Sequence, residues 1–444
     1  MTSLFRYTCI LAVAALAFFS VASCTKSEFQ GPTLVSDSVN YKRTFTINPG
    51  ESVTLTAMFE NPESLSFTWF IDGAETAASG PSFLFTTKES GSYIITEKIS
   101  NNTATVLIDY YVLVRGPYDS GSFLFDNSST EGTLTFINSD FSEVQEKAYA
   151  TVNPGKTLGT KIVSVNIYQG KLYILSKSEG LIVANAITLK EITRIKEIPA
   201  SANYFLPLNR AKALLSTDNG IYQVNLNPLT VGEKVPGIGG RVGMMVNGKS
   251  YIMALTLENG IVAIDPIKMI GYRALNVGRS GLAQDMSGNV WTSYLDTLYS
   301  VNSSLYVKKY LLPQGFRVTS SWNPWNEGSL CASTIENSLF YVSSKTDGMP
   351  SNKIVRVDLN TIDNNINDIN KPILLSYFLE LTGDRVFNGI GLRISPKNNI
   401  TASTVSSTGG SPKVLIIRAG DGTLVKDIDV ANSSSASMLF MNAQ

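Results

Sequence analysis

Residues 166–195 read NIYQGKLYILSKSEGLIVANAITLKEITRI, a series of four short apolar runs separated by polar turns. The turns fall at Gly170-Lys171, at Ser178-Glu179-Gly180 and just before Lys190. Short apolar runs bounded by glycine-containing turns are typical of antiparallel β-strands. The segment therefore predicts one four-stranded antiparallel sheet.

The same pattern recurs at intervals close to forty residues, with turns at Ala211-Lys212, Gly248-Lys249 and Gly288-Asn289 and looser copies at 323–359 and 392–419. Four short strands per repeat at this period are typical of β-propeller blades, because one blade cannot bury both of its faces without neighbours. A further copy lies at 121–138, and the strand at 435–442 is placed to complete it. The fold class is thus all-β, with a seven-bladed β-propeller over 118–444; six or eight blades remain open.

The region before the propeller, residues 38–116, predicts a small β-sandwich. Alternating runs such as ESVTLTAMF, LSFTWFIDG and GSYIITEKISN turn about every ten residues, which is the spacing of sandwich strands. The pair FTWFIDG and SGSYIITEKISN resembles PKD-like and immunoglobulin-like domains of bacterial surface proteins. Trp69 and Tyr93 are expected in its core, and the domain is interpreted as a spacer.

The N-terminus predicts a targeting signal. A basic residue, Arg6, precedes the apolar run CILAVAALAFFSVA, which is too short to span a membrane. The stretch SVASC, ending at Cys24, resembles the bacterial lipobox, which implies a signal peptide over 1–23, acylation of Cys24 and a tether over 24–37. An ordinary signal peptide with a chance cysteine is the alternative. Lipid anchors a protein without making it span the membrane, and the sequence leaves open whether it faces the periplasm or the cell surface.

Composition excludes several classes of function. Lys+Arg and Asp+Glu are equal at 36 each, so no net charge recruits nucleic acid. The chain has no histidine, which excludes a Ser-His-Asp triad and histidine-ligated metals. After signal removal Cys331 is the one free thiol, so no internal disulfide is expected. The Asp- and Asn-rich segment 358–376 could suggest calcium, but it lacks an EF-hand pattern and is interpreted as a solvated loop; no metal or cofactor is expected.

Arginines recur at one register of the repeat. Arg241, Arg279 and Arg317 are spaced by 38 residues, each just before the first strand of its blade, and Asn203 holds the corresponding earlier position. Equal register predicts side chains at one level near the mouth of the axial channel. The arginines would bind an anionic ligand group there, or they would form ion pairs between blades with partners such as Asp285 and Asp296.

Aromatic and amide side chains share this register. The candidate ligand-binding set adds six residues to Asn203 and the arginines: Tyr204, Trp322, Asn323, Trp325, Asn326 and Asn388. Aromatic rings beside amides suit a flat ligand with polar edges, or a partner protein. Packing between blades is the alternative, and it is the expectation for Trp291.

From Gly121 onward the chain resembles surface propeller lipoproteins of gut Gram-negative bacteria, of the YncE-like, cobalamin-capturing type. The segments that carry this likeness are GSFLFDNSSTEGTLTFIN, IVSVNIYQGKLYILS, ANYFLPLNRAKALLS and DGTLVKDIDV. The resemblance implies an outer-membrane lipoprotein that binds a corrinoid (vitamin B12) at the propeller mouth for a TonB-dependent transporter. At Asp126-Asn127-Ser128 the chain departs from the family's Asn-Glu-Gly-like segment, which weakens the inference about the ligand.

Three other functions remain open. Exposed tryptophans also suit glycan capture, and a scaffold within a transporter complex would bind protein alone. A propeller lactonase or hydrolase would need converging carboxylates and a metal, where the register shows Arg and Asn. The chain is therefore expected to be a binding protein and not an enzyme.

Overall fold

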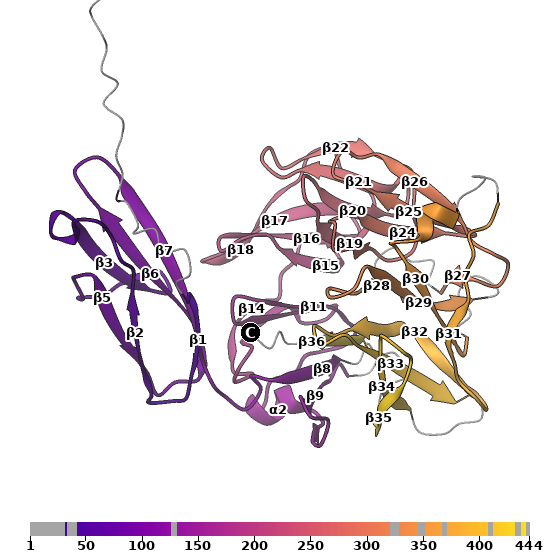
Figure 1. Cartoon of the computed structure of the whole chain (residues 1–444), viewed down its shortest axis with the longest axis horizontal. Coiled ribbons are helices and arrows are strands. Elements are labelled where there is room, and N and C mark those ends of the chain that lie inside the picture. The colour runs from indigo at the N-terminus through magenta and orange to yellow at the C-terminus, as the bar shows by residue number, and fades with distance from the viewer. Residues whose placement is uncertain are drawn as a thin grey trace, which may run out of the picture. The chain divides into compact units, whose positions relative to one another are not determined.

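The structure is a computed structural model, and it describes residues 32, 42–125, 131–319, 328–344, 351–365, 371–406, 412–430 and 437–440. The chain is all-β apart from short helical turns, as predicted. It divides into two compact units (Figure 1), the first comprising residues up to Lys88 with Tyr93–Leu113 and the second comprising Glu89–Ser92 with Val114–Gln444. No helix among the described residues has the length and apolar character needed to cross a membrane.

The first unit consists of two sheets. The larger has the order β1-β7-β6-β3-β4 and the smaller pairs β2 with β5. Their bounds are Thr44–Ile47 (β1), Ser52–Thr56 (β2), Ser66–Ile71 (β3), Ala74–Glu75 (β4), Ser82–Thr86 (β5), Gly91–Ser100 (β6) and Thr105–Val114 (β7), with a 3-10 turn η2 at Pro62–Ser64.

Trp69 joins these two sheets. Its ring is fully buried and stacks on Phe83 of the smaller sheet and on Tyr110 of its own sheet, at centroid distances of 5.3 and 5.9 Å. Its Nε1 donates to the carbonyl of Gly80 at 2.9 Å. The expectation that Trp69 is a core residue is confirmed, whereas Tyr93 is half-buried and packs on Phe85.

A carboxyl group is buried beside this tryptophan. Glu97 lies directly opposite Trp69 in the β3–β6 register and is fully buried. Its Oε2 accepts a hydrogen bond from the Tyr110 hydroxyl at 2.8 Å, while its Oε1 has no partner among the described residues. Burial raises the pKa of Glu97 to about 7, against the opposing effect of the hydrogen bond from Tyr110.

The second unit is a succession of small antiparallel sheets. The described residues form seven of them, numbered here sheets 1 to 7 in chain order. Sheet 1 contains β8 (Gly121–Phe125), β9 (Leu134–Asn138), β10 (Val144–Gln145) and the last strand of the chain, β36 (Ser437–Phe440). Sheet 2 contains β11 (Ile162–Tyr168), β12 (Lys171–Ser176), β13 (Gly180–Asn185) and β14 (Glu191–Ile195). Sheet 3 contains β15 (Ala202–Pro207), β16 (Lys212–Thr217), β17 (Gly220–Leu226) and β18 (Leu229–Lys234).

The later sheets follow the same order. Sheet 4 contains β19 (Val242–Asn247), β20 (Ile252–Thr256), β21 (Gly260–Asp265) and β22 (Ile270–Ala274), and sheet 5 contains β23 (Ala283–Gln284), β24 (Val290–Tyr294), β25 (Thr297–Val301) and β26 (Val307–Leu311). Sheet 6 contains β27 (Arg317–Val318), β28 (Cys331–Ala332), β29 (Ser338–Ser344), β30 (Lys353–Asp358), the 3-10 turn η3 (Ile362–Asn365) and β31 (Tyr377–Glu380). Sheet 7 contains β32 (Arg385–Ile394), β33 (Asn399–Ser406), β34 (Lys413–Arg418) and β35 (Leu424–Asp429).

These sheets stand around a common centre, in a propeller-like arrangement (Figure 1). Neighbouring first strands contact each other, as β11 does with β15, β15 with β19, and β28 with β32. β36 contacts β32 and pairs with β8, with Ser437 opposite Phe125. The predicted completion of the first sheet by the C-terminal strand is confirmed.

Glycine explains why the turn between the second and third strands recurs so faithfully. Gly180 and Gly260 each begin a third strand with φ of +73° and +62°. A Cβ there would lie 2.0 Å from the Ile195 carbonyl oxygen and 2.3 Å from that of Val277. Glycine is therefore required at both positions, because it alone avoids the backbone at the end of the fourth strand or just after it.

A short helix and an ion network brace sheet 2. The helix α2 (Ala148–Val152) carries the buried Tyr149, whose hydroxyl donates to Glu191 of β14. Arg194 binds the same carboxylate at 2.6 Å and also binds Glu179. These contacts hold α2 on the outer strand of the sheet.

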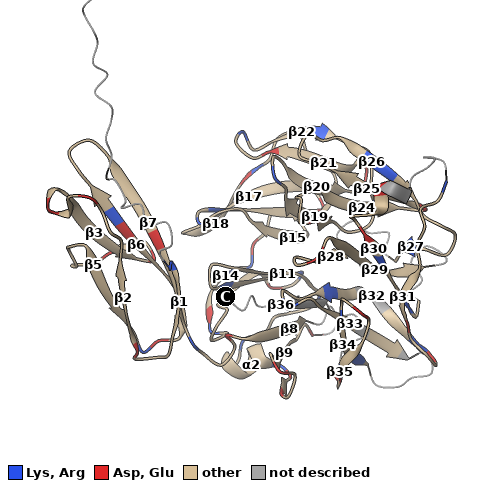
Figure 2. Ribbon diagram, viewed as in Figure 1, with Lys and Arg blue, Asp and Glu red and all other residues tan. Residues whose placement is uncertain are grey.

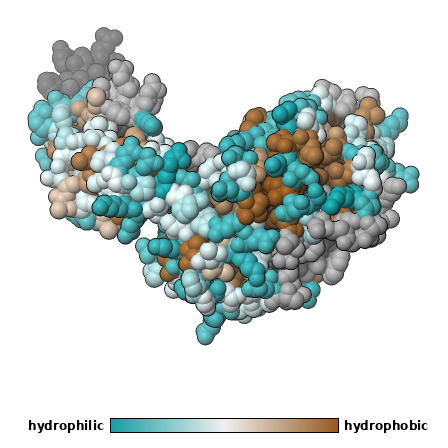
Figure 3. Space-filling view, turned by 90° about the horizontal axis from the view of Figure 1, so that it is seen from below, coloured by the Kyte–Doolittle hydropathy of each residue, from teal (hydrophilic) through white to brown (hydrophobic). Residues whose placement is uncertain are grey.

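The surface of the second unit mixes charges and carries some apolar side chains. Acidic and basic residues are interspersed in Figure 2, in keeping with their equal numbers. On the face seen in Figure 3, hydrophobic residues gather in one area of this unit beside hydrophilic ones. Exposed apolar residues of the unit include Ile267, Tyr272 and Leu374.

We expect the first unit to lose stability as the pH rises from about 4.5 to about 7. The pKa of Glu97 is raised to about 7 in the folded chain, so the unfolded chain releases its proton first. The folded unit keeps its full stability below the pKa that Glu97 has in the unfolded chain. It loses about 3 kcal/mol of unfolding free energy as the pH rises past the pKa that Glu97 has in the folded chain. Glu97→Gln should remove this dependence. Hydrogen exchange of residues 91–114 at pH 5 and pH 8 measures it; equal pH dependence in both proteins would contradict the assignment.

Candidate site: a polar cavity between sheets 5 and 6

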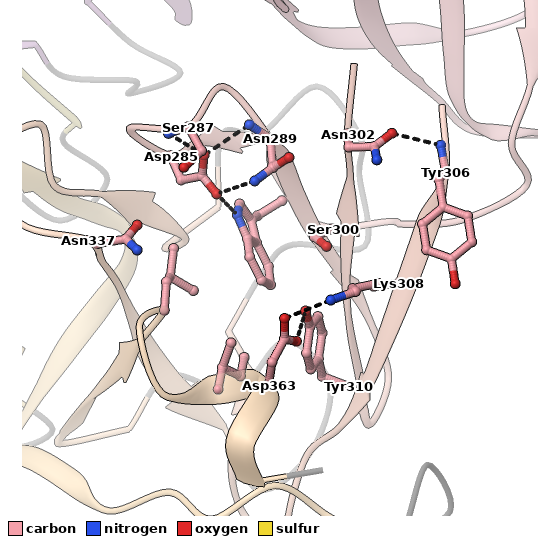
Figure 4. A pocket seen from close by; sticks show the side chains of 13 residues that line it. Asp285, Ser287, Asn289, Ser300, Asn302, Tyr306, Lys308, Tyr310, Asn337 and Asp363 are labelled. Carbon is pink, nitrogen blue, oxygen red and sulfur yellow. Dashed lines mark hydrogen bonds and ion pairs between the residues drawn. The ribbon is translucent and has the colours of Figure 1, made fainter. Parts of the chain in front are cut away.

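A cavity of about 230 Å³ lies between sheets 5 and 6 (Figure 4). Sheet 5 contributes the turn between β23 and β24, the strands β24 to β26 and the turn before β26. Sheet 6 contributes Asn337, just before β29, and the segment that follows β30. The lining residues are Asp285, Ser287, Asn289, Trp291, Ser300, Asn302, Tyr306, Lys308, Tyr310, Asn337, Leu359, Ile362 and Asp363.

One wall of the cavity is a buried tryptophan held by a carboxylate. Trp291 of β24 stacks on Tyr310 of β26 at a centroid distance of 5.5 Å, and both rings are buried. The indole Nε1 donates to Asp285 Oδ2 at 2.7 Å. Asp285 also accepts from the backbone N–H groups of Ser287 and Asn289 and from the Asn289 amide. With four hydrogen bonds, Asp285 is fixed as a structural group and orients the tryptophan.

The wall next to this tryptophan holds an ion pair and a phenol. Lys308 Nζ lies 2.7 Å from Asp363 Oδ2, and the Tyr310 hydroxyl donates to Asp363 Oδ1 at 3.0 Å. The hydrogen bond from Lys308 lowers the pKa of Asp363 below its ordinary value. Burial, followed by the bond to Asp363, raises the pKa of Tyr310. At neutral pH this wall is therefore a charge-balanced group with a protonated phenol.

Three amide side chains bring unused hydrogen-bonding atoms to the cavity. Asn302 uses its Oδ1 to accept the backbone N–H groups of Ser304 and Tyr306, and its Nδ2 bonds to no described residue. Asn289 donates through its Nδ2, and its Oδ1 accepts from no described residue. Asn337 donates to Asn360, while its buried Oδ1 has no partner among the described residues. The cavity thus offers a donor and two acceptors from three different turns.

Two of the three register arginines contact the preceding sheet. The Arg279 guanidinium donates to the carbonyl of Leu257, just after β20, and Arg317 makes a two-point ion pair with Asp296, just after β24. The hydrogen bonds from Arg317 lower the pKa of Asp296. Arg241 lies exposed before β19, and its carbonyl accepts the N–H of Leu257, so it and Arg279 share one backbone partner. The partner of Arg317, Asp296, belongs to sheet 5, one sheet after the sheet that contains Leu257.

Asn203 follows the same rule. It is buried and accepts from Lys177, in the turn after β12, at 2.7 Å. It donates to Asp218 of its own sheet and to the carbonyl of Val242 in the next sheet. Ties between neighbouring sheets, the alternative left open for this register, therefore describe Asn203, Arg279 and Arg317. Of the two predicted acidic partners, Asp296 is confirmed; Asp285 is corrected, because it binds Trp291 and its own turn.

The other predicted residues have different outcomes. Tyr204 is buried and packs with Val242 and Met245. Burial raises the pKa of its phenol, against an opposing effect of Arg393. Asn388 lies in β32, with its side chain outside the described residues. Trp322, Asn323, Trp325 and Asn326 also lie outside them, as does Cys24.

No sequence pattern groups the cavity residues, because they come from strands and turns of two repeats. The signal that could have found them is the motif DMSGNVW, where an aspartate, an asparagine and a tryptophan share one strand connection. Arg393 was also missed; it lies half-buried in β32, and desolvation of its guanidinium lowers its pKa. Among the described residues no group of acidic or cysteine side chains is arranged to hold a metal.

The Arg317–Asp296 pair should behave as a structural tie. Arg317→Ala and Asp296→Ala should each lower the free energy of unfolding slightly, and their double mutant should show a coupling of about 0.5 kcal/mol because both groups are partly exposed. Denaturant unfolding in low and high salt measures it. An additive double mutant would contradict the pairing.

The chain is similar to several known structures. The crystal structure of a quinonprotein alcohol dehydrogenase-like protein from Bacteroides thetaiotaomicron matches with a TM-score of 0.57 and 18% identity, covering 93% of this chain and 100% of that one. Dihydro-heme d1 dehydrogenase NirN in complex with DHE (TM-score 0.46, 8% identity, 86% and 76% coverage) and apo AztD from Citrobacter koseri (0.44, 13%, 84% and 98%) also match.

The first likeness shows the fold alone, which is propeller-like. No curated protein matches the sequence. The family model of a domain of unknown function, DUF5074, matches residues 121–440. Because this match covers most of the chain, the protein belongs to the DUF5074 family.

Proposed function

We propose that this chain is a lipid-anchored binding protein that captures a neutral, hydroxyl-rich ligand, of carbohydrate type, in the cavity between sheets 5 and 6. In this proposal the first unit is the PKD-like or immunoglobulin-like spacer and the second is a seven-bladed propeller. The packing of Trp69 between two sheets supports the spacer, and the pairing of β36 with β8 supports the closed ring. A TonB-dependent transporter is the proposed receiver of the ligand.

The observation that carries the proposal is the set of unused amide atoms around an aromatic wall. A sugar ring offers hydroxyls that both donate and accept, which matches Asn302 Nδ2 with the Oδ1 atoms of Asn289 and Asn337. Tyr306, 63% exposed at the rim, offers a ring and a hydroxyl. The volume of about 230 Å³ lies below the ~300–1,000 Å³ of drug-sized sites and suits one ring.

The same geometry favours a glycan over the corrinoid expected from the sequence. The corrinoid expectation relied on register arginines as partners of its phosphate, and Arg279 and Arg317 contact neighbouring sheets. A corrin ring also exceeds the cavity. The proposal therefore places cobalamin and cobinamide in the test as the competing ligands.

The acidic groups support binding without catalysis. Hydrolysis of a glycosidic bond uses two carboxyl groups, one as an acid and one as a base or nucleophile. Asp285 has four hydrogen-bond donors and Asp363 has Lys308 and Tyr310. Both carboxylates are committed to neighbours within the cavity walls.

Calorimetry on the purified full chain tests the ligand class. D-glucose, D-galactose, D-mannose, N-acetyl-D-glucosamine, cobalamin and cobinamide would each be titrated. Asn302→Asp keeps the oxygen that caps the turn and replaces the donor, so sugar binding should weaken at least tenfold, by about 1.4 kcal/mol. Asn209→Asp is the matched control, because Asn209 Oδ1 caps another turn away from the cavity. Heat with a corrinoid and none with any sugar would overturn the carbohydrate proposal.

The lipid anchor is testable separately. In a Gram-negative host the wild-type chain should incorporate labelled palmitate and sediment with outer membranes. Cys24→Ala should abolish both, because it removes the thiol that carries the lipid. Surface proteolysis of intact cells would distinguish the outer face from the periplasmic one. Unchanged sedimentation of the variant would contradict acylation at Cys24.

A further inference from the structure

A second cavity, of about 160 Å³, lies between sheets 7 and 1. Its walls are the start of β8, the turn after β9 and the hairpin that joins β32 to β33. The residues that matter below are Phe141 from sheet 1 and Ser395, Lys397, Asn399 and Thr401 from sheet 7. All of them are among the described residues.

This cavity occupies the same place between its two sheets as the first cavity does between sheets 5 and 6. In each, one wall is the turn between the first and second strands of the earlier sheet, 285–289 or 395–399. The Asp285 N–H donates to the Asn289 carbonyl at 3.0 Å, and the Ser395 N–H donates to the Asn399 carbonyl at 2.8 Å. The other walls are also equivalent. Phe141 follows β9, which is the third strand of sheet 1 when counted from β36, and Asp363 follows β30, the third strand of sheet 6.

The two cavities differ at the position of the tryptophan. DMSGNVW aligns with SPKNNIT, so Thr401 stands where the first cavity has Trp291, and Ser395 stands where it has Asp285. The small side chain leaves open the space that the indole fills. Ser395 Oγ accepts the N–H of Asn399 at 3.1 Å, much as Asp285 accepts that of Asn289.

Thr401 has a polar atom without a partner. The residue is fully buried, and its Oγ1 has no hydrogen-bond partner among the described residues. A buried hydroxyl left unpaired is destabilising, so native proteins pair nearly all such groups with protein, water or ligand. The hydroxyl belongs to a residue that lines a cavity large enough for a ligand group.

We propose that the cavity between sheets 7 and 1 is a second saccharide subsite. The proposal rests on the proposed function, because the sugar chemistry is inferred from the first cavity. The half-buried ring of Phe141 would stack on the apolar face of a sugar, and the Thr401 hydroxyl and the Asn399 amide would bind its hydroxyls. Lys397 at the hairpin would tolerate an acidic substituent on that sugar.

Two sites at equivalent seams imply a ligand with repeated rings. One protein molecule would then hold two sugar units of a single glycan, or one sugar unit from each of two glycans, on one side of the propeller. Two weak contacts held by one carrier give a stronger overall attachment than either contact alone. Each subsite would accept a single monosaccharide, and an oligomeric glycan would offer a ring to both.

Stoichiometry tests the proposal. Calorimetry of the full chain with D-glucose, D-galactose, D-mannose and N-acetyl-D-glucosamine should give two sites for the sugar that binds. Thr401→Val and, separately, Phe141→Ala should reduce two sites to one, as should Asn302→Asp in the first cavity. Combining Thr401→Val with Asn302→Asp should leave none. Thr401→Val should keep or raise the melting temperature, because its hydroxyl has no hydrogen bond to lose, so the variant reports on binding and not on unfolding.

The outcomes separate this inference from the proposed function. One site in the wild type, lost with Asn302→Asp and unchanged by Thr401→Val and Phe141→Ala, overturns the second subsite and leaves the first. Two sites that both survive Thr401→Val and Phe141→Ala also overturn it. No heat with any of the four sugars overturns both proposals.

Discussion

The antiparallel pairing of β36 with β8 is the interaction on which the second unit depends. Without it, β8 would present unpaired backbone groups at the centre of the unit, and sheet 1 would lack the strand that contacts β32. Each small sheet exposes two apolar faces, so it is stable only between two neighbours. The first and last sheets obtain their missing neighbours from each other, and their shared core of Leu124, Ile137, Val414 and Ile416 follows from that closure.

The seams between the sheets show how one repeated geometry serves two purposes. Where polar side chains meet across a seam, they tie the sheets together, as Arg317 does with Asp296. At the seam between sheets 6 and 7, Ser333 donates to Asn398, which in turn binds Glu336. Where the facing turns do not meet, a cavity remains. The side chains at a few turn positions therefore decide whether polar contacts close a seam or a cavity remains there.

The sequence predicted the all-β class and the succession of four-stranded sheets because both follow from short-range patterns. Glycines such as Gly180 and Gly260 mark the turns, and strand alternation marks the rest. The register of Arg279 and Arg317 was also readable, but not its purpose, because the partner of each lies in a turn of the preceding repeat. The cavity escaped prediction for the same reason: Asn302 and Asn337 belong to different sheets, and nothing local links them.

The late position of β36 has a consequence for biosynthesis. The strand that completes sheet 1 is made roughly 300 residues after β8, so closure is a contact of very long sequence separation. During synthesis, sheet 1 keeps one open edge until the final strand is made. A chain interrupted before residue 437 would keep that edge exposed, and such edges invite aggregation and proteolysis. The pairing that completes sheet 1 is therefore available only to the finished chain.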